Sequence, residues 1–135
     1  MSALPGAPKG DILIVEQAAM VGGIIVSTAR QLRLPGVRLA TSTRAAQLLL
    51  EQHAFSALIV SLNEEGPALE MIQNLRSGKY RTLADSPVAV TTTACGLDLA
   101  QSLRGFLVRR ILLKPFKVRD VILTISMLGD EQGTS

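Results

Sequence analysis

The chain has 135 residues, of which 47% are hydrophobic and 19% are charged. This length fits one domain with a closed core, and the composition is too apolar for a disordered chain. One cysteine, Cys95, excludes an intramolecular disulfide, and one histidine, His53, excludes a histidine-rich metal site. No apolar run approaches the roughly 20 residues that span a bilayer, and residues 1–10 lack the apolar core of a signal peptide. We therefore expect a cytoplasmic, single-domain protein.

The net charge of +3 is unevenly distributed along the chain. Six basic residues and no acidic residue fall within residues 101–119. They are Arg104, Arg109, Arg110, Lys114, Lys117 and Arg119. The other 8 of the 14 basic residues stand against 11 acidic residues, which gives the rest of the chain a net charge of −3. The positive excess is therefore one local cluster on a mildly acidic body.

Short apolar runs alternate with segments of helical spacing along the chain. The apolar runs predict buried strands at residues 11–15, 37–40, 57–60, 87–91 and 111–113. The helical spacing predicts helices at residues 18–34, 44–52, 66–76, 98–107 and 118–128. We expect residues 1–9 and 129–135 to be flexible, which leaves one domain over residues 10–128.

The spacing of apolar residues and the residue types at the helix ends also predict details of these helices. One face of the first helix should contain Met20, Ile24, Thr28 and Leu32, with Val21, Ile25 and Ala29 beside it. The apolar face of the second helix should contain Ala45, Leu48 and Leu49. Ser42 or Thr43 should cap the second helix. These faces should pack against the sheet.

Five strand–helix units in alternation predict an α/β protein of the (βα)5 type. Strands that are apolar on both faces require a parallel sheet with helices on both sides. Right-handed crossovers then favour a five-stranded, doubly wound sheet. In such sheets the functional crevice lies at the carboxyl ends of the strands. The residues to examine there are Glu16 and Gln17, residues 61–65, residues 91–95, and Lys114 with Pro115.

At these positions residues 10–128 resemble a receiver domain of the response regulators, the CheY-like family. Residues 112–116, LLKPF, match the family's Lys-Pro-Phe signature at the end of the fifth strand. Thr92 precedes Lys114 at the spacing of the family's Thr and Lys pair. The resemblance implies a flavodoxin-like or CheY-like fold, a role in two-component signalling or a phosphorelay, and a cis bond between Lys114 and Pro115.

The residues that carry the family's phosphoryl chemistry are largely replaced. The family takes a phosphoryl group on an Asp at the end of the third strand, where this chain has Ser61, and no Asp lies between Asp11 and Asp85. The acidic pair that helps to hold Mg²⁺ is reduced to Glu16 followed by Gln17. The aromatic switch residue of the fifth strand is replaced by Ile111. We therefore expect a pseudo-receiver with no cofactor, weak or absent Mg²⁺ binding and no enzymatic activity.

Lys114 and Thr92 keep the residue types that the resemblance implies, and two interpretations of them stay open. Lys114 and the Thr92 hydroxyl can form a residual anion site with loop N–H groups. Alternatively, Lys114 forms a salt bridge with Glu16 across the crevice and fixes the ends of the first and fifth strands. We favour the salt bridge.

The basic cluster is the best remaining functional feature of the sequence. The resemblance places it on the fourth helix, fifth strand and fifth helix, a surface that receivers use for dimerisation and partner binding. We expect a protein-interaction module that docks a histidine kinase, another regulator or a second copy of itself. The alternatives are a site for a nucleotide second messenger such as a cyclic dinucleotide, or a solvated face. Nucleic-acid binding is a weaker expectation, because few aromatic residues are available for stacking. The candidate face consists of Arg104, Arg109, Arg110, Lys117 and Arg119.

Overall fold

A computed structural model describes residues 10–34 and 36–133. The strands are β1 (Ile12–Val15), β2 (Val37–Ala40), β3 (Ala57–Ser61), β4 (Val88–Thr92) and β5 (Arg110–Leu113). The helices are α1 (Ala19–Gln31), α2 (Thr43–Gln52), α3 (Glu65–Arg76), α4 (Leu97–Gly105) and α5 (Val118–Gly133). A short 3₁₀ turn, Leu62–Glu64, joins β3 to α3.

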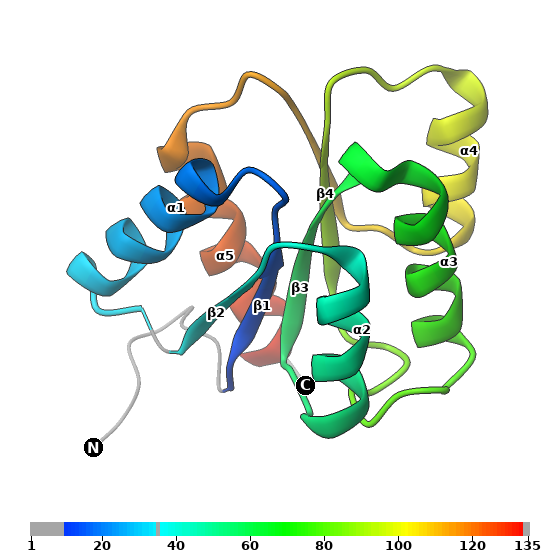
Figure 1. Ribbon diagram of the computed structural model, residues 1–135, viewed down its shortest axis with the longest axis horizontal. Helices are drawn as coiled ribbons and strands as arrows, with labels where there is room; N and C mark the ends of the chain where they lie inside the picture. Colours follow the sequence, from blue (N-terminus) through cyan, green and yellow to red (C-terminus); the bar gives the residue numbers. More distant parts are fainter. Residues whose placement is uncertain (1–9, 35, 134–135) are drawn as a thin grey trace.

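The five strands form one parallel sheet in the order β2-β1-β3-β4-β5. Helices α1 and α5 lie on one face of the sheet, and α2, α3 and α4 lie on the other (Figure 1). The predicted (βα)5 doubly wound fold is therefore confirmed. This topology brings the carboxyl ends of β1, β3, β4 and β5 to one edge.

Successive residues of each buried strand supply opposite sides of the sheet, so the core has two parts. Leu13 and Leu58 pack with α2 and α3 residues such as Leu75 on one side. Ile12 and Ile59 pack on the other side, against α1 and α5. β1 and β3 are fully buried, as the continuous apolar runs predict.

The predicted apolar face of α1 is right at its flank and wrong at its centre. Ile25 and Ala29 are buried, as predicted, together with Gly22, whereas Met20 is 80% exposed and Ile24 is 47% exposed. A Cβ at Gly22 would lie 2.6 Å from the Leu39 side chain on β2, so the missing side chain permits close packing there. The buried face of α1 therefore includes the position that packs against the Leu39 side chain.

The predicted face of α2 is also wrong at its centre. Leu48 is half exposed, and the helix buries Ala46 and Leu50 instead. Ser42 is the N-cap, because its hydroxyl accepts a hydrogen bond from the N–H of Ala45 at 3.1 Å. Starting the helix at this cap sets which residues point inward.

The fifth strand is not buried on both faces, contrary to the prediction. Leu112 is buried, but Ile111 is 36% exposed and Leu113 is 56% exposed. β5 is an edge strand, and α4 ends at Gly105 without covering its outer residues. An apolar strip is thus exposed between α4 and β5.

The last helix differs from the prediction in where it ends. Helix α5 runs to Gly133, five residues beyond its predicted end at Leu128. The predicted flexible segment 1–9 and residues 134–135 lie outside the described residues. Within the part of the chain that is described, no helix is both long and apolar enough to cross a membrane.

Candidate functional site

Four strand ends bring the predicted crevice residues to one edge of the sheet. Glu16 follows β1, Ser61 ends β3, Thr92 ends β4 and Lys114 follows β5. Three of them form a contact cluster, with Lys114 at its centre. The Nζ atom of Lys114 lies 3.0 Å from Oε1 of Glu16 and donates a hydrogen bond to Oγ of Ser61 at 3.0 Å. The favoured salt bridge is therefore confirmed.

The side chains of this cluster are largely buried, and that of Glu16 is almost completely so. Only 3% of the Glu16 side chain and 17% of the Lys114 side chain are exposed, and Ser61 is fully buried. The second carboxylate oxygen of Glu16 accepts from the N–H of Ala18 at 3.0 Å. Lys114 also donates to Oδ1 of Asn63 at 3.3 Å. Both oxygens of the buried carboxylate thus have partners, as a buried charge requires.

Thr92 does not join the cluster through its hydroxyl. Its Oγ1 donates instead to the carbonyl of Ala94 at 3.0 Å and so braces the connection that leads from β4 to α4. Of the two residues of the alternative anion site, Lys114 is therefore directed at the crevice and the Thr92 hydroxyl is not. The bond between Lys114 and Pro115 is cis, as the resemblance implies.

A second carboxylate, Glu64, organises the mouth of the crevice. Its Oε1 accepts hydrogen bonds from the N–H and the hydroxyl of Thr43 at 2.9 and 2.8 Å, and from the side-chain amide of Gln17 at 3.2 Å. These donors stabilise the ionised form and lower the pKa of Glu64, the backbone donor of Thr43 most strongly. The bonds tie the start of α2 to the end of the 3₁₀ turn.

The oxygen atoms at this edge do not fit Mg²⁺. One oxygen of Glu16 is ion-paired with Lys114, and the other holds the N–H of Ala18. The Gln17 amide turns toward Glu64, and its carbonyl oxygen is a buried atom without a hydrogen-bond partner. A hard divalent cation needs several oxygens that it can approach together. Among the described residues no group of three or more His, Cys, Asp and Glu side chains is arranged to hold a metal.

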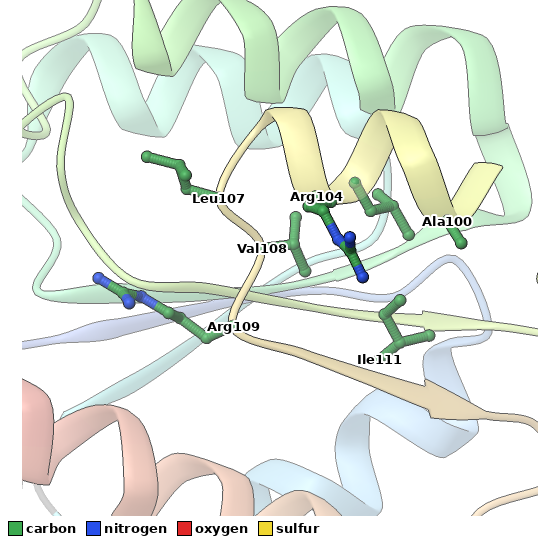
Figure 2. Close-up of a pocket in the computed structure, with 7 residues that line it drawn as sticks. Ala100, Arg104, Leu107, Val108, Arg109 and Ile111 are labelled. Atoms are coloured by element: carbon green, nitrogen blue, oxygen red, sulfur yellow. The ribbon is translucent and has the colours of Figure 1, made fainter. Parts of the chain in front are cut away.

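The structure divides the basic residues of the sequence cluster between four places. Lys114 lies within the crevice, as described above. Arg104 and Arg109 line a cavity of about 380 Å³ between α4 and β5, beside the side chain of Ile111 (Figure 2). Arg110 lies on the opposite side of the strand from Ile111, because successive residues alternate.

The remaining two basic residues, Lys117 and Arg119, are exposed at the start of α5, after the far end of β5. A strand of this length separates the residues at its two ends by roughly 10 Å. The cluster is therefore spread over α4, β5 and α5, and Arg104 and Arg109 share a cavity.

One organising residue was missed in the sequence, and the contacts of two others were not predicted. Asn63 and Glu64 belong to the segment 61–65 that the sequence marks for the crevice, but nothing in their spacing predicts their partners. Arg76, at the end of α3, has its Nε and Nη1 atoms bonded to the carbonyls of Phe106, Ala84 and Ser86 at 2.7–2.8 Å. Only its place before a long polar connector could have indicated such a role.

No family model and no curated protein sequence matches this chain. Solved structures of receiver domains do match it. The receiver domain of the Francisella response regulator 1452 is 13% identical, and the match covers 92% of this chain and 99% of that one with a TM-score of 0.78. The chemotaxis protein CheY4 of Vibrio cholerae is 20% identical, with coverage of 88% and 98% and a TM-score of 0.72.

A third match is a response regulator of Burkholderia pseudomallei, whose structure contains a phosphorylated aspartic acid, a calcium ion and citrate. It is 18% identical, and the match covers 93% of this chain and 71% of that one with a TM-score of 0.72. At these identities the likeness concerns the fold. The chain therefore has the fold of response-regulator receiver domains, the CheY-like α/β fold.

Proposed function

We propose that this chain is a receiver-type signalling module that works without aspartyl phosphorylation and acts through protein–protein contact at the face formed by α4, β5 and α5. The observation that carries the proposal is the cluster at the crevice. Lys114 lies 3.0 Å from both Glu16 Oε1 and Ser61 Oγ. In receiver domains, as the resemblance implies, the lysine at this position binds an oxygen of the phosphoryl group on the aspartate.

The chemistry of Ser61 supports the loss of phosphoryl transfer. A serine hydroxyl needs a general base to become a good nucleophile. Its neighbour, Lys114, is ion-paired with Glu16 and donates a hydrogen bond to Oγ of Ser61, so it is placed as a donor to this hydroxyl and not as its base. Ser61 is also fully buried. The chain therefore lacks both the acceptor and the activation that the resemblance implies for the family.

Mass spectrometry tests this part of the proposal. The purified chain is incubated with Mg²⁺ and acetyl phosphate, a small phosphodonor, beside a receiver that is known to be phosphorylated. We expect no mass increase in this chain and one phosphoryl group in the control receiver. A phosphoryl group on the wild-type chain would refute the proposal. The variant Ser61→Asp shows whether the acceptor alone is missing, because it restores a carboxylate at this position.

The contact face is supported by the exposed basic and apolar residues of α4 and β5. Arg109→Glu combined with Arg110→Glu should abolish association with a histidine kinase, another regulator or a second copy, while circular dichroism stays unchanged. Arg30→Glu with Arg33→Glu on the α1 side is the matched control, because both arginines are exposed and the charge change is the same. Unchanged association in the first variant would count against the face.

A nucleotide second messenger is the alternative occupant of this face. The observation in its favour is that Arg104 and Arg109 line the same cavity, since paired guanidinium groups suit phosphate oxygens. A cyclic dinucleotide at millimolar concentration should then raise the melting temperature by mass action. No shift would remove this alternative.

A further inference from the structure

The connector between α3 and β4, residues 77–87, is a packed segment at the amino edge of the sheet, where the strands begin, opposite the crevice. In Figure 1 it runs along the lower side of the molecule, past the end of α2. Thr82 is fully buried and Ser86 is 2% exposed, although both are polar and neither lies in a helix or strand. Buried polar side chains need hydrogen-bond partners, so this connector must be bonded to the elements beside it.

On one side the connector is bonded to the end of α2 and to the residues that lead into β3. The hydroxyl of Thr82 donates to the carbonyl of His53 at 2.7 Å and accepts from the N–H of Phe55 at 3.1 Å. The N–H groups of Arg81 and Thr82 both donate to the carbonyl of Leu50 on α2, at 3.0 and 3.2 Å. Because Thr82 is buried, loss of its hydroxyl would remove a partner from two backbone groups that water does not reach.

On the other side one side chain, Arg76, joins the connector to the end of α4. Its Nη1 atom donates to the carbonyls of Ala84 and Ser86 at 2.7 Å, and its Nε atom donates to that of Phe106 at 2.8 Å. Its Nη2 atom lies 3.5 Å from the carbonyl oxygen of Leu107. A single planar guanidinium therefore holds two backbone segments, 84–86 and 106–107, next to each other.

The charges around Arg76 have both signs, and they do not define a site for one ion. Burial lowers the pKa of Arg76 most, the positive charge of Arg109 lowers it further, and the negative charge of Asp85 raises it. These three side chains line one cavity of about 320 Å³. The bonds of Arg76 to carbonyl oxygens depend on where the backbone lies, so a displacement of either segment must disturb the other.

Helix α4 is lightly packed, so its end depends on the contact with Arg76. Of its nine residues only Leu103 is buried, whereas α3 has four buried residues. The turn after α4 is closed by the N–H of Leu107, which donates to Arg104, and by that of Val108, which donates to Leu103, both at 3.0 Å. Leu107 has a φ of 60°, in the left-handed region that residues with a side chain disfavour. Such an element opens at a lower free energy than the central strands.

We propose that residues 77–87 and Arg76 couple the end of α2 to the end of α4, so that the two ends open together. Thr82 holds the connector to α2 and β3, and Arg76 holds it to α4. This inference goes beyond the proposed function, because it involves neither the crevice nor a partner. It gives the position of α4 a determinant at the amino edge, on the side of the sheet away from Lys114.

Native-state hydrogen exchange of the ¹⁵N-labelled chain, followed by nuclear magnetic resonance, tests this coupling. Thr82→Val removes the hydroxyl at nearly constant volume and should raise the exchange rate of the Val108 N–H at least fivefold. The N–H of Leu34 is the control, because it closes a turn of the same kind after α1, where Arg33 has a φ of 57°. It should change less than twofold. No change at Val108, or an equal change at Leu34, would overturn the proposal.

Variants of Arg76 show whether this residue carries the coupling. In Arg76→Met the turn after α4 is released from the connector, so the Val108 N–H should exchange faster and Thr82→Val should then change it less than twofold. Arg76→Lys keeps the charge but loses the planar fork, and it allows the same comparison if Arg76→Met does not fold. An effect of Thr82→Val that is equally large with and without Arg76 would contradict the assignment.

Ser61→Ala separates this coupling from the crevice and from unfolding of the whole chain. Like Thr82→Val, it removes a hydroxyl from a fully buried residue, but at the carboxyl edge of the sheet. The exchange rate of the Val108 N–H should change less than twofold. An increase as large as that in Thr82→Val would show that Val108 exchanges through global unfolding and would overturn the proposal. None of these rates depends on phosphorylation or on a partner, so the proposed function can fail or stand independently.

Discussion

The crevice and the cavity between α4 and β5 lie at two ends of the same strand, β5, and they differ in how far their side chains are buried. In the crevice Lys114 is paired with a buried carboxylate and bonded to Ser61. In the cavity Leu107 is 64% exposed and Ile111 is 36% exposed. Contacts that are buried within the chain serve stability, whereas an exposed apolar surface can be covered by a partner. Substitutions on each side should therefore affect different properties.

Loss of Lys114 should have the largest effect on stability. In Lys114→Met the Glu16 carboxylate, 2% exposed, is left without its countercharge, and we expect the free energy of unfolding to fall by about 3–5 kcal/mol. Urea denaturation at neutral pH measures this. Lys117→Met, at an exposed position nearby, should change stability by less than about 0.5 kcal/mol. Equal effects of the two variants would mean that the crevice pair is not a structural contact.

Loss of Arg76 should come next. Arg76→Met removes the donor that the carbonyls of Ala84, Ser86 and Phe106 share, and we expect a loss of about 2–3 kcal/mol. Hydrogen exchange should increase first around the end of α4. Arg104→Met, on the exposed surface of the same helix, is the control and should stay near the wild-type value. Unchanged hydrogen exchange at α4 in Arg76→Met would contradict the role of Arg76 in fixing the end of this helix.

Removing the Ser61 hydroxyl should have a smaller effect. It accepts from Lys114 at 3.0 Å and from the N–H of Asn63 at 3.4 Å, but Lys114 keeps its bond to Glu16. We expect Ser61→Ala to lose about 1 kcal/mol in the same denaturation experiment. A loss as large as that of Lys114→Met would show that the hydroxyl, and not the ion pair, holds the strand ends together.

The Glu64 network should give a weak pH dependence. The pKa of Glu64 is below its usual 4.5 in the folded chain, so its stabilising contribution is complete above that value and is lost as the pH falls through the lowered folded pKa. Stability measured between neutral and acid pH should therefore depend less on pH in Glu64→Gln than in the wild type. Glu65→Gln removes the same charge one residue later. Parallel curves for Glu64→Gln and the wild type would contradict the role of Thr43 and Gln17 as donors.

Much of the fold could be predicted from the sequence because strand burial follows directly from continuous apolar runs. The helix faces were harder, since a stripe of large residues such as Met20 and Ile24 predicts burial, but Gly22 permits the closer packing that decides α1. The exposure of the edge strand β5 could not be predicted either. Ile111 belongs to an apolar run like those of the central strands, and only the sheet order places it beside solvent.

The crevice was partly predictable for a similar reason. Residues that directly follow strands must meet at the carboxyl edge, which placed Glu16 and Lys114 together before their distance was known. The loop contacts of Asn63 and Glu64 depend on the 3₁₀ turn, which no sequence pattern indicated. The linear charge cluster of residues 101–119 was misleading in one respect, because alternation along β5 places the neighbours Arg109 and Arg110 on opposite sides of the strand.

The most direct test of the account compares amide spectra of the ¹⁵N-labelled chain before and after addition of Mg²⁺ and acetyl phosphate. Because the contacts of Lys114 close the crevice, the signals of Glu16, Ser61 and Lys114 should stay in place, together with those of α4 and β5. Shifts at the crevice that spread to Leu107 and Ile111 would show a phosphoryl-dependent switch and contradict the account.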